Sequence, residues 1–229
     1  MVRFQRAARA VAALIGLGGI SAPALAATIN VDNVQLPYSE SLNLNGYIDG
    51  SSYSDNGQPA GQIVLTVNNI GSANQYTLPV WCVDIFHDIA LNGSGYQYSE
   101  GALGTDNSNQ PSALSSLQIT EITDLASYGN ALMRSSPSNQ TSAEVQAAIW
   151  LVEYNNGSGN SLAITGGTFT STDIANLIAN AVAAGGIAGQ LIALNGGQAE
   201  VFDAVPEPAS FSLLGAGLFG LVCVRRRKG

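Results

Sequence analysis

The sequence predicts an α+β domain, a β-sandwich or barrel with a helical insertion, flanked by a signal peptide and a C-terminal hydrophobic helix. Alternating apolar patterns typical of strands fill the first half of the chain, up to about residue 98. Helical periodicity follows between residues 111 and 184, and then a closing hairpin. We therefore divide the chain into residues 1–27, a body of residues 28–204, and a tail of residues 205–229.

Two segments near the start of the body alternate apolar and polar residues, as half-buried strands do. These are residues 28–34 and 62–67. Between them, residues 49–61 are rich in Gly, Ser, Asn and Pro and are expected to form a turn region. Residues 49–57 loosely suggest a calcium loop, but they lack the ordered ligands and closing Glu of an EF-hand. A flexible turn without metal is the alternative, and no metal site is predicted.

The next apolar stretch, residues 76–89, is longer and has Pro79 near its middle. Because proline donates no hydrogen bond to a strand ladder, this pattern predicts two strands or one strand with a bulge. Residues 96–98 follow the turn sequence Asn-Gly-Ser-Gly at residues 92–95. They are expected to return as the second strand of a hairpin.

Three later segments carry apolar residues at helical spacing. They are residues 111–133, a helix that starts near residues 141–144, and residues 173–184. Thr141 and Glu144 have the spacing of a capping box, and Gly185 with Gly186 is a helix-ending signal. Residues 190–194 and 200–205 flank Asn-Gly-Gly, which indicates a closing hairpin.

The charges of the chain are unevenly distributed. The formal net charge is −8, yet seven of the eight Lys and Arg residues lie in the two end segments, leaving Arg134 in the body. All sixteen Asp and Glu residues lie between Asp32 and Glu207. Nucleic-acid binding requires clustered cations, so this acidic body excludes that class of partner. The length of the body fits one domain with a sizeable core.

The N-terminal segment has the three parts of a secretory signal peptide. Three arginines precede the apolar run at residues 10–20, and the small residues at 23–27 fit an A-x-A cleavage site. We expect the Sec translocase to export the chain and the signal peptide to be removed near residue 27. This segment therefore takes no part in the fold.

The tail has a short polar motif, an apolar run and a basic stop. In chain order these are Pro206, Glu207 and Pro208, the run at residues 209–224, and Arg225, Arg226, Arg227 and Lys228. A bilayer-spanning helix needs about 20 apolar residues, with examples near 17, so the run is slightly short. The four cations would hold that end in the cytoplasm. A plain membrane anchor is one interpretation.

Motif, run and basic cluster, in this order at the end of the chain, resemble the PEP-CTERM sorting signal of Gram-negative bacteria. The resemblance implies that an exosortase-type membrane enzyme processes the chain near Pro206, Glu207 and Pro208. It further implies transient residence in the inner membrane and then a place on the cell surface or in the extracellular matrix.

The chain has two cysteines, and Cys223 lies in the tail that processing would remove. Cys82 would then be alone in the mature body, which excludes an intramolecular disulfide. A lone cysteine in an oxidising compartment indicates intermolecular pairing, a reactive thiol, or a buried inert side chain. The sequence leaves these three alternatives open.

Two short motifs resemble the thioester domains of bacterial surface adhesins. They are WCVD at residues 81–84, in an expected strand, and VQAAIW at residues 145–150, in an expected helix. The resemblance spans about residues 78–154 and implies that the Cys82 sulfur attacks the side-chain carbonyl of Gln146, expelling ammonia. The resulting thioester would acylate an amine or hydroxyl. Val145 and Trp81 stand where that family often has Thr and Tyr. The alternative is a core cysteine and a surface glutamine.

His87 is the sole histidine. A Cys–His hydrolase would need Cys82 and His87 in hydrogen-bond contact, but residues five apart on one strand point to opposite faces. His87 could instead influence acyl transfer at a thioester, or simply be exposed. Asp84 and Asp88 are expected to face solvent. No catalytic residue and no cofactor is predicted.

These observations predict a non-enzymatic, exported surface or extracellular-matrix protein with a covalent adhesion module. Its expected partners are the exosortase-type enzyme, the Sec translocase, and an amine- or hydroxyl-bearing surface ligand or exopolysaccharide. The alternative is a structural or carbohydrate-associated matrix protein without thioester chemistry. A secreted enzyme is the third possibility.

Overall fold

The computed structural model describes residues 28–48, 50–69, 75–101, 103, 114–155, 159–193 and 198–203. The expected signal peptide, the hydrophobic tail helix and the basic stop lie outside these residues. Within the described part of the chain, no helix is both long and apolar enough to cross a membrane.

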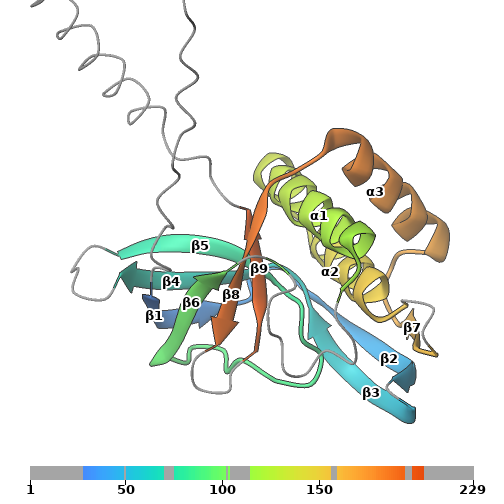
Figure 1. Ribbon diagram of the computed structural model, residues 1–229, viewed down its shortest axis with the longest axis horizontal. Coiled ribbons are helices and arrows are strands. Elements are labelled where there is room, and N and C mark those ends of the chain that lie inside the picture. Colours follow the sequence, from blue (N-terminus) through green and yellow to red (C-terminus); the bar gives the residue numbers. More distant parts are fainter. Residues whose placement is uncertain are drawn as a thin grey trace, which may run out of the picture.

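Six antiparallel strands close into a barrel (Figure 1). Around the barrel they are β1 (Thr28–Gln35), β4 (Ile63–Asn69), β5 (Gln75–Cys82), β9 (Glu200–Asp203), β8 (Ala188–Ala193) and β6 (Tyr96–Gly101). The fold is therefore built on the barrel, not the sandwich. Apolar side chains such as Ile29, Val31, Leu65 and Val67 are fully or almost fully buried. They fall on one side of each strand, as the period of two requires for a barrel interior.

A second sheet has the order β3-β2-β7, with β2 (Glu40–Ile48), β3 (Ser51–Ala60) and β7 (Ser161–Thr165). The expected turn region at residues 49–61 is wrong, because Ser51–Ala60 pairs with β2 along its length. Its Ser, Asn, Asp and Gly residues lack the apolar alternation of a strand. The apolar face comes from β2, where Leu42 and Leu44 are fully buried. Gly50, at φ 76°, adopts the left-handed conformation beside the turn that joins the two strands.

Three helices, α1 (Ser116–Ser135), α2 (Asn139–Tyr154) and α3 (Ser171–Ala184), lie between β6 and β8 in the chain, which confirms the helical insertion. They gather on one side of the barrel (Figure 1). The capping box at Thr141 and Glu144 is wrong, because α2 begins earlier, and its N-cap Ser138 accepts from the Thr141 amide at 3.0 Å. Gly185, at φ 70°, ends α3 as expected.

The closing hairpin is confirmed by the antiparallel pairing of β8 with β9. The hairpin expected for residues 96–98 is wrong, because β6 pairs with β1 and β8. Residues 76–89 contain one strand, which ends at Cys82. Pro79 is tolerated there because β9 pairs only with Val80, Trp81 and Cys82, so no ladder bond is lost on that side.

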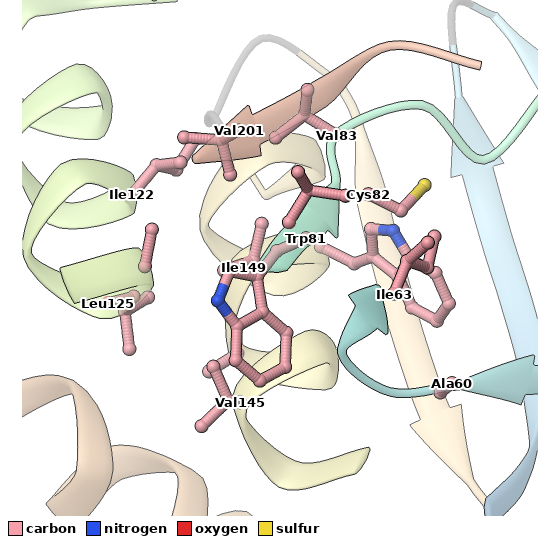
Figure 2. Close-up of a cluster of buried hydrophobic side chains, with 14 of the residues drawn as sticks. Ala60, Ile63, Trp81, Cys82, Val83, Ile122, Leu125, Val145, Ile149 and Val201 are labelled. Atoms are coloured by element: carbon pink, nitrogen blue, oxygen red, sulfur yellow. The ribbon is translucent and has the colours of Figure 1, made fainter. Parts of the chain in front are cut away.

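The outer face of the barrel packs against the helices. Figure 2 shows Val83 and Val201 turned toward Ile122 on α1, with Val145 and Ile149 of α2 nearby. Gly129 makes the close approach of α1 possible: a Cβ there would lie 2.5 Å from Val145 Cγ1 and 3.0 Å from the Trp81 ring. This packing fixes α2 beside the end of β5, where the two sequence motifs meet.

Candidate functional site

Cys82 is the last residue of β5 and is only 2% exposed. Strand alternation places it on the same face as Val80 and opposite Trp81 and Val83. Figure 2 agrees, because the Cys82 sulfur points away from the α1 side of the cluster. The sulfur is therefore directed toward the barrel end and away from α1.

Gln146 lies on α2, between Val145 and Ala147, and is 1% exposed. Its side-chain Oε1 accepts a hydrogen bond from the Cys82 amide at 3.0 Å, and its Nε2 donates to the Cys82 carbonyl at 2.8 Å. The structure thus brings together two predicted site residues that are 64 positions apart. The alternative of a surface glutamine is wrong at this position.

The parity of the β5–β9 ladder explains why the Cys82 backbone is available to Gln146. The Val83 amide donates to the Ala199 carbonyl at 3.0 Å, so the backbone groups of Val83 point toward β9. Those of Cys82 consequently point the other way, toward β4. The ladder with β4 ends at the pair Ile63 and Val80. The Gln146 carboxamide takes the place of the missing strand partner.

The thiol of Cys82 is bonded to the turn that follows β5. Its Sγ donates to the Asp84 carbonyl at 3.0 Å, and the Asp84 amide donates to Sγ at 3.3 Å. Burial, and next the charge of Glu200, raise the pKa of Cys82 well above its ordinary value, although Asp84 and Trp150 act in the opposite direction. Because the thiolate is the reactive form, this thiol needs a nearby base before it can attack.

Asp84 is 1% exposed, so the expectation that it faces solvent is wrong. Its carboxylate accepts from the Phe86 amide at 2.9 Å and lies 2.8 Å from His87 Nδ1. It therefore orders the turn after β5 from inside. Asp88 is exposed, as expected. The sulfur of Cys82 and the ring of His87 both contact atoms of Asp84.

A cavity of about 60 Å³ opens beside the two motif residues. Its lining includes Cys82, Gln146 and Trp150, together with Asp88, Ile89 and Gln198. The volume is enough for a few water molecules or one small amine, and too small for a drug-sized ligand. A group that reaches Gln146 must therefore be narrow.

Sequence reasoning missed the buried Glu200, which β9 places directly opposite Cys82. A single Glu in a short terminal strand carries no local signal of burial. Among the described residues, no group of three His, Cys, Asp or Glu side chains could hold a metal ion.

Comparisons with known proteins concern the tail. Residues 204–228 match the PEP-CTERM protein-sorting motif. This PEP-CTERM match contains Pro206, Glu207 and Pro208 and extends through the basic stop. The chain is therefore an exported protein that an exosortase-type enzyme processes at the membrane. No curated protein and no solved structure matches the chain.

Proposed function

We propose that this exported protein is a surface or matrix adhesion module in which Cys82 and Gln146 form an internal thioester. One observation carries the proposal: the Gln146 carboxamide is held against Cys82 by two hydrogen bonds in a buried site. The reaction requires a thiol next to an amide carbonyl, with water excluded. The contact of the Gln146 carboxamide on α2 with the Cys82 backbone at the end of β5 supports the proposal.

Thioester formation needs no co-reactant. The Cys82 sulfur attacks the side-chain carbonyl carbon of Gln146, a carbon–sulfur bond forms, and the carbon–nitrogen bond breaks. The thiol proton ends on the leaving nitrogen, which departs as ammonia. The Nε2 bond to the Cys82 carbonyl is lost in the process. The hydrogen bond from the Cys82 amide to Gln146 Oε1 can persist, and it polarises the Gln146 side-chain carbonyl for attack.

Coupling to a partner breaks the carbon–sulfur bond of the thioester. An amine or hydroxyl of a surface ligand or exopolysaccharide attacks the Gln146 carbonyl, and the Cys82 thiol is released as its proton is returned. The partner stays bound to Gln146 through an amide or ester. Because the acyl donor is consumed once, the protein acts as an adhesin and not as an enzyme. The body contains no lysine that could quench the bond internally.

Intact-mass measurement of the fresh, natively purified protein tests the proposal. The wild type should be lighter than its sequence by one ammonia, and Cys82→Ala and Gln146→Ala should each restore the full mass. Incubation with methylamine should increase the mass of the wild type by one methylamine, and it should release the Cys82 thiol for alkylation. A wild type of full mass, with Cys82 freely alkylated after unfolding, would sink the proposal.

A structural matrix protein without covalent chemistry is the second candidate. The observation that favours it is the same pair of hydrogen bonds, because they satisfy the Cys82 backbone at the end of the ladder. In that case Gln146 serves the fold alone. The mass measurement separates the two candidates, since a structural Gln146 keeps its amide nitrogen.

A further inference from the structure

Glu200 stands directly across from Cys82 in the β5–β9 ladder. The bond from the Val83 amide to the Ala199 carbonyl makes the neighbouring pair hydrogen-bonded, so Cys82 and Glu200 form a non-hydrogen-bonded pair. Side chains of such a pair share one face of the sheet, with Cβ atoms about 4.5–5.5 Å apart. The register therefore places a carboxyl group beside the thiol, inside the barrel.

This carboxyl group is buried without a partner. Glu200 is 0% exposed, and neither of its carboxyl oxygens accepts or donates a hydrogen bond in the structure. Burial, and next the charge of Asp84, raise the pKa of Glu200 well above its ordinary value. The buried site therefore favours the protonated form of Glu200, which has one O–H donor and one free carbonyl acceptor.

Tyr98 adds a second polar group to the same interior. Glu200 pairs with Leu191 on β8, which pairs with Glu100 on β6. Tyr98, two residues before Glu100, therefore lies on the same inner face as Glu200. Its hydroxyl is also buried without a hydrogen-bond partner. Unsatisfied polar groups in a core cost stability, and an apolar residue would serve packing better. The fold alone does not account for a carboxyl group at this position.

We propose that Glu200 is the proton shuttle for formation of the Cys82–Gln146 thioester. The inference rests on the proposed function. As the sulfur attacks the Gln146 carbonyl carbon, the carbonyl oxygen of the Glu200 carboxyl accepts the thiol proton. The Glu200 O–H gives its proton to the departing amide nitrogen. The carbon–sulfur bond forms, ammonia leaves, and Glu200 ends protonated as it began.

Other acidic groups near the thiol are less suited to this role. The Asp84 carboxylate is engaged by the Phe86 amide and the His87 ring. Glu153, on α2, has a smaller effect than Glu200 on the pKa of Cys82. It is buried as well, so it provides a matched control for the loss of a buried carboxyl group.

The test compares Glu200→Gln with Glu153→Gln in the full-length chain, exported and processed in a host with the sorting system. Ammonia is the probe, because ammonolysis of the thioester regenerates Gln146 and the free thiol. After ammonia is removed by buffer exchange, intact mass follows the return of the deficit. General acid–base groups typically contribute factors of about 10²–10⁴. We expect Glu200→Gln to slow the return by about 100-fold or more, and Glu153→Gln to follow the wild type.

Three results would overturn the shuttle. If the mass deficit returns in Glu200→Gln at the wild-type rate, Glu200 is not the proton shuttle, although the thioester itself still forms. Equal slowing in Glu153→Gln shows a general effect of lost buried carboxyl groups. A wild type of full mass removes the proposed function, and the shuttle with it. Thermal unfolding of both variants verifies that each is folded.

If Glu200→Gln fails to fold, the pH profile of the wild type decides. The titratable groups that interact with Glu200 are Cys82 and Asp84, on β5 and the turn after it, and Tyr98 on β6. Glu153, on α2, acts on the Cys82 thiol. A shuttle that must start protonated predicts a rate that falls as pH rises through the raised pKa of Glu200. A rate that rises with pH throughout, as unassisted thiolate attack predicts, would overturn the proposal.

Discussion

The indole N–H of Trp81 donates to the side-chain oxygen of Asn130 at 2.9 Å, which ties the residue before Cys82 to helix α1. The same Asn130 oxygen accepts from Gln62 Nε2 at 2.6 Å. All three side chains are buried. The Asn130 side-chain oxygen therefore connects α1 to β5 and to the residue directly before β4, on both sides of the candidate site.

Asn130→Ala should lower the free energy of unfolding by about 2–4 kcal/mol, because it strands the buried donors of Trp81 and Gln62. Urea denaturation measures the loss. Asn180→Ala, at an exposed position of α3, is the matched control and should change stability by no more than about 0.5 kcal/mol. Equal stability of the two variants would contradict a structural role for Asn130.

Gln146→Met keeps the length of the side chain but removes the carboxamide that pairs with Cys82. The Cys82 amide and carbonyl then lose their partners, and we expect the protein to lose about 2–4 kcal/mol of stability. Gln140→Met, exposed on the same helix, controls for the residue change. If urea denaturation gave Gln146→Met the same free energy of unfolding as the wild type, these two hydrogen bonds would add nothing to the stability of the fold.

Gly129→Ala should be destabilising by about 1–3 kcal/mol, although alanine is the better helix former by about 1 kcal/mol. The added Cβ would lie 2.5 Å from Val145 Cγ1. Val145→Ala removes that atom, so the double variant should recover part of the loss relative to the sum of the single changes. Additive effects in thermal or urea unfolding would argue against a direct clash.

Glu200→Gln should change how stability depends on pH. The pKa of Glu200 is raised in the folded state, so between about pH 4.3 and that raised value the folded protein binds more protons than the unfolded chain. Wild-type stability should therefore fall as pH rises through this window, by up to ~1.4 kcal/mol per pH unit from this group. Below about pH 4.3 Glu200 is protonated in both the folded and the unfolded state, so its contribution to the slope of stability against pH vanishes.

The measurement is the difference in unfolding free energy between Glu200→Gln and wild type across that window. Other groups with raised pKa values, such as Asp124 and Glu144, are present in both proteins and cancel. The variant should gain relative to wild type as pH increases. A constant difference would mean that Glu200 titrates alike in the folded and unfolded states.

Glu207→Ala should impair processing of the tail, because Glu207 is the charged residue of the matched sorting motif. In a host with an exosortase, we expect unprocessed chain, with its C-terminal epitope retained, to accumulate in the membrane fraction. Pro137→Ala, outside the motif, should be processed normally. Immunoblotting of the fractions measures both, and normal release of Glu207→Ala would contradict a role for this residue in recognition.

Local patterns were enough for part of the fold. The apolar alternation of β1 and β4 and the helical spacing of α1 and α3 were visible because each element carries its own buried face. Strand β3 was missed for the opposite reason: the sequence SSYSDNGQPA has the composition of a turn, and β2 supplies its pairing partner. The short β7 was missed as well.

The candidate site shows the same division. A resemblance in two short motifs indicated Cys82 and Gln146, and the structure brings them together. Glu200 could not be found in this way, since its burial follows from the register of β5 against β9. Register depends on how distant strands align, and no single segment records it.

The position of β9 would tie formation of the proposed thioester to the timing of export. β9 closes the barrel between β5 and β8, and the sorting motif begins at residue 204, directly after it. In a chain that emerges N-terminus first, Cys82 and Gln146 reach the outside well before Glu200 does. The ring stays open until the last strand arrives. Maturation of the reactive bond would then wait until the body has crossed the membrane, just ahead of tail removal.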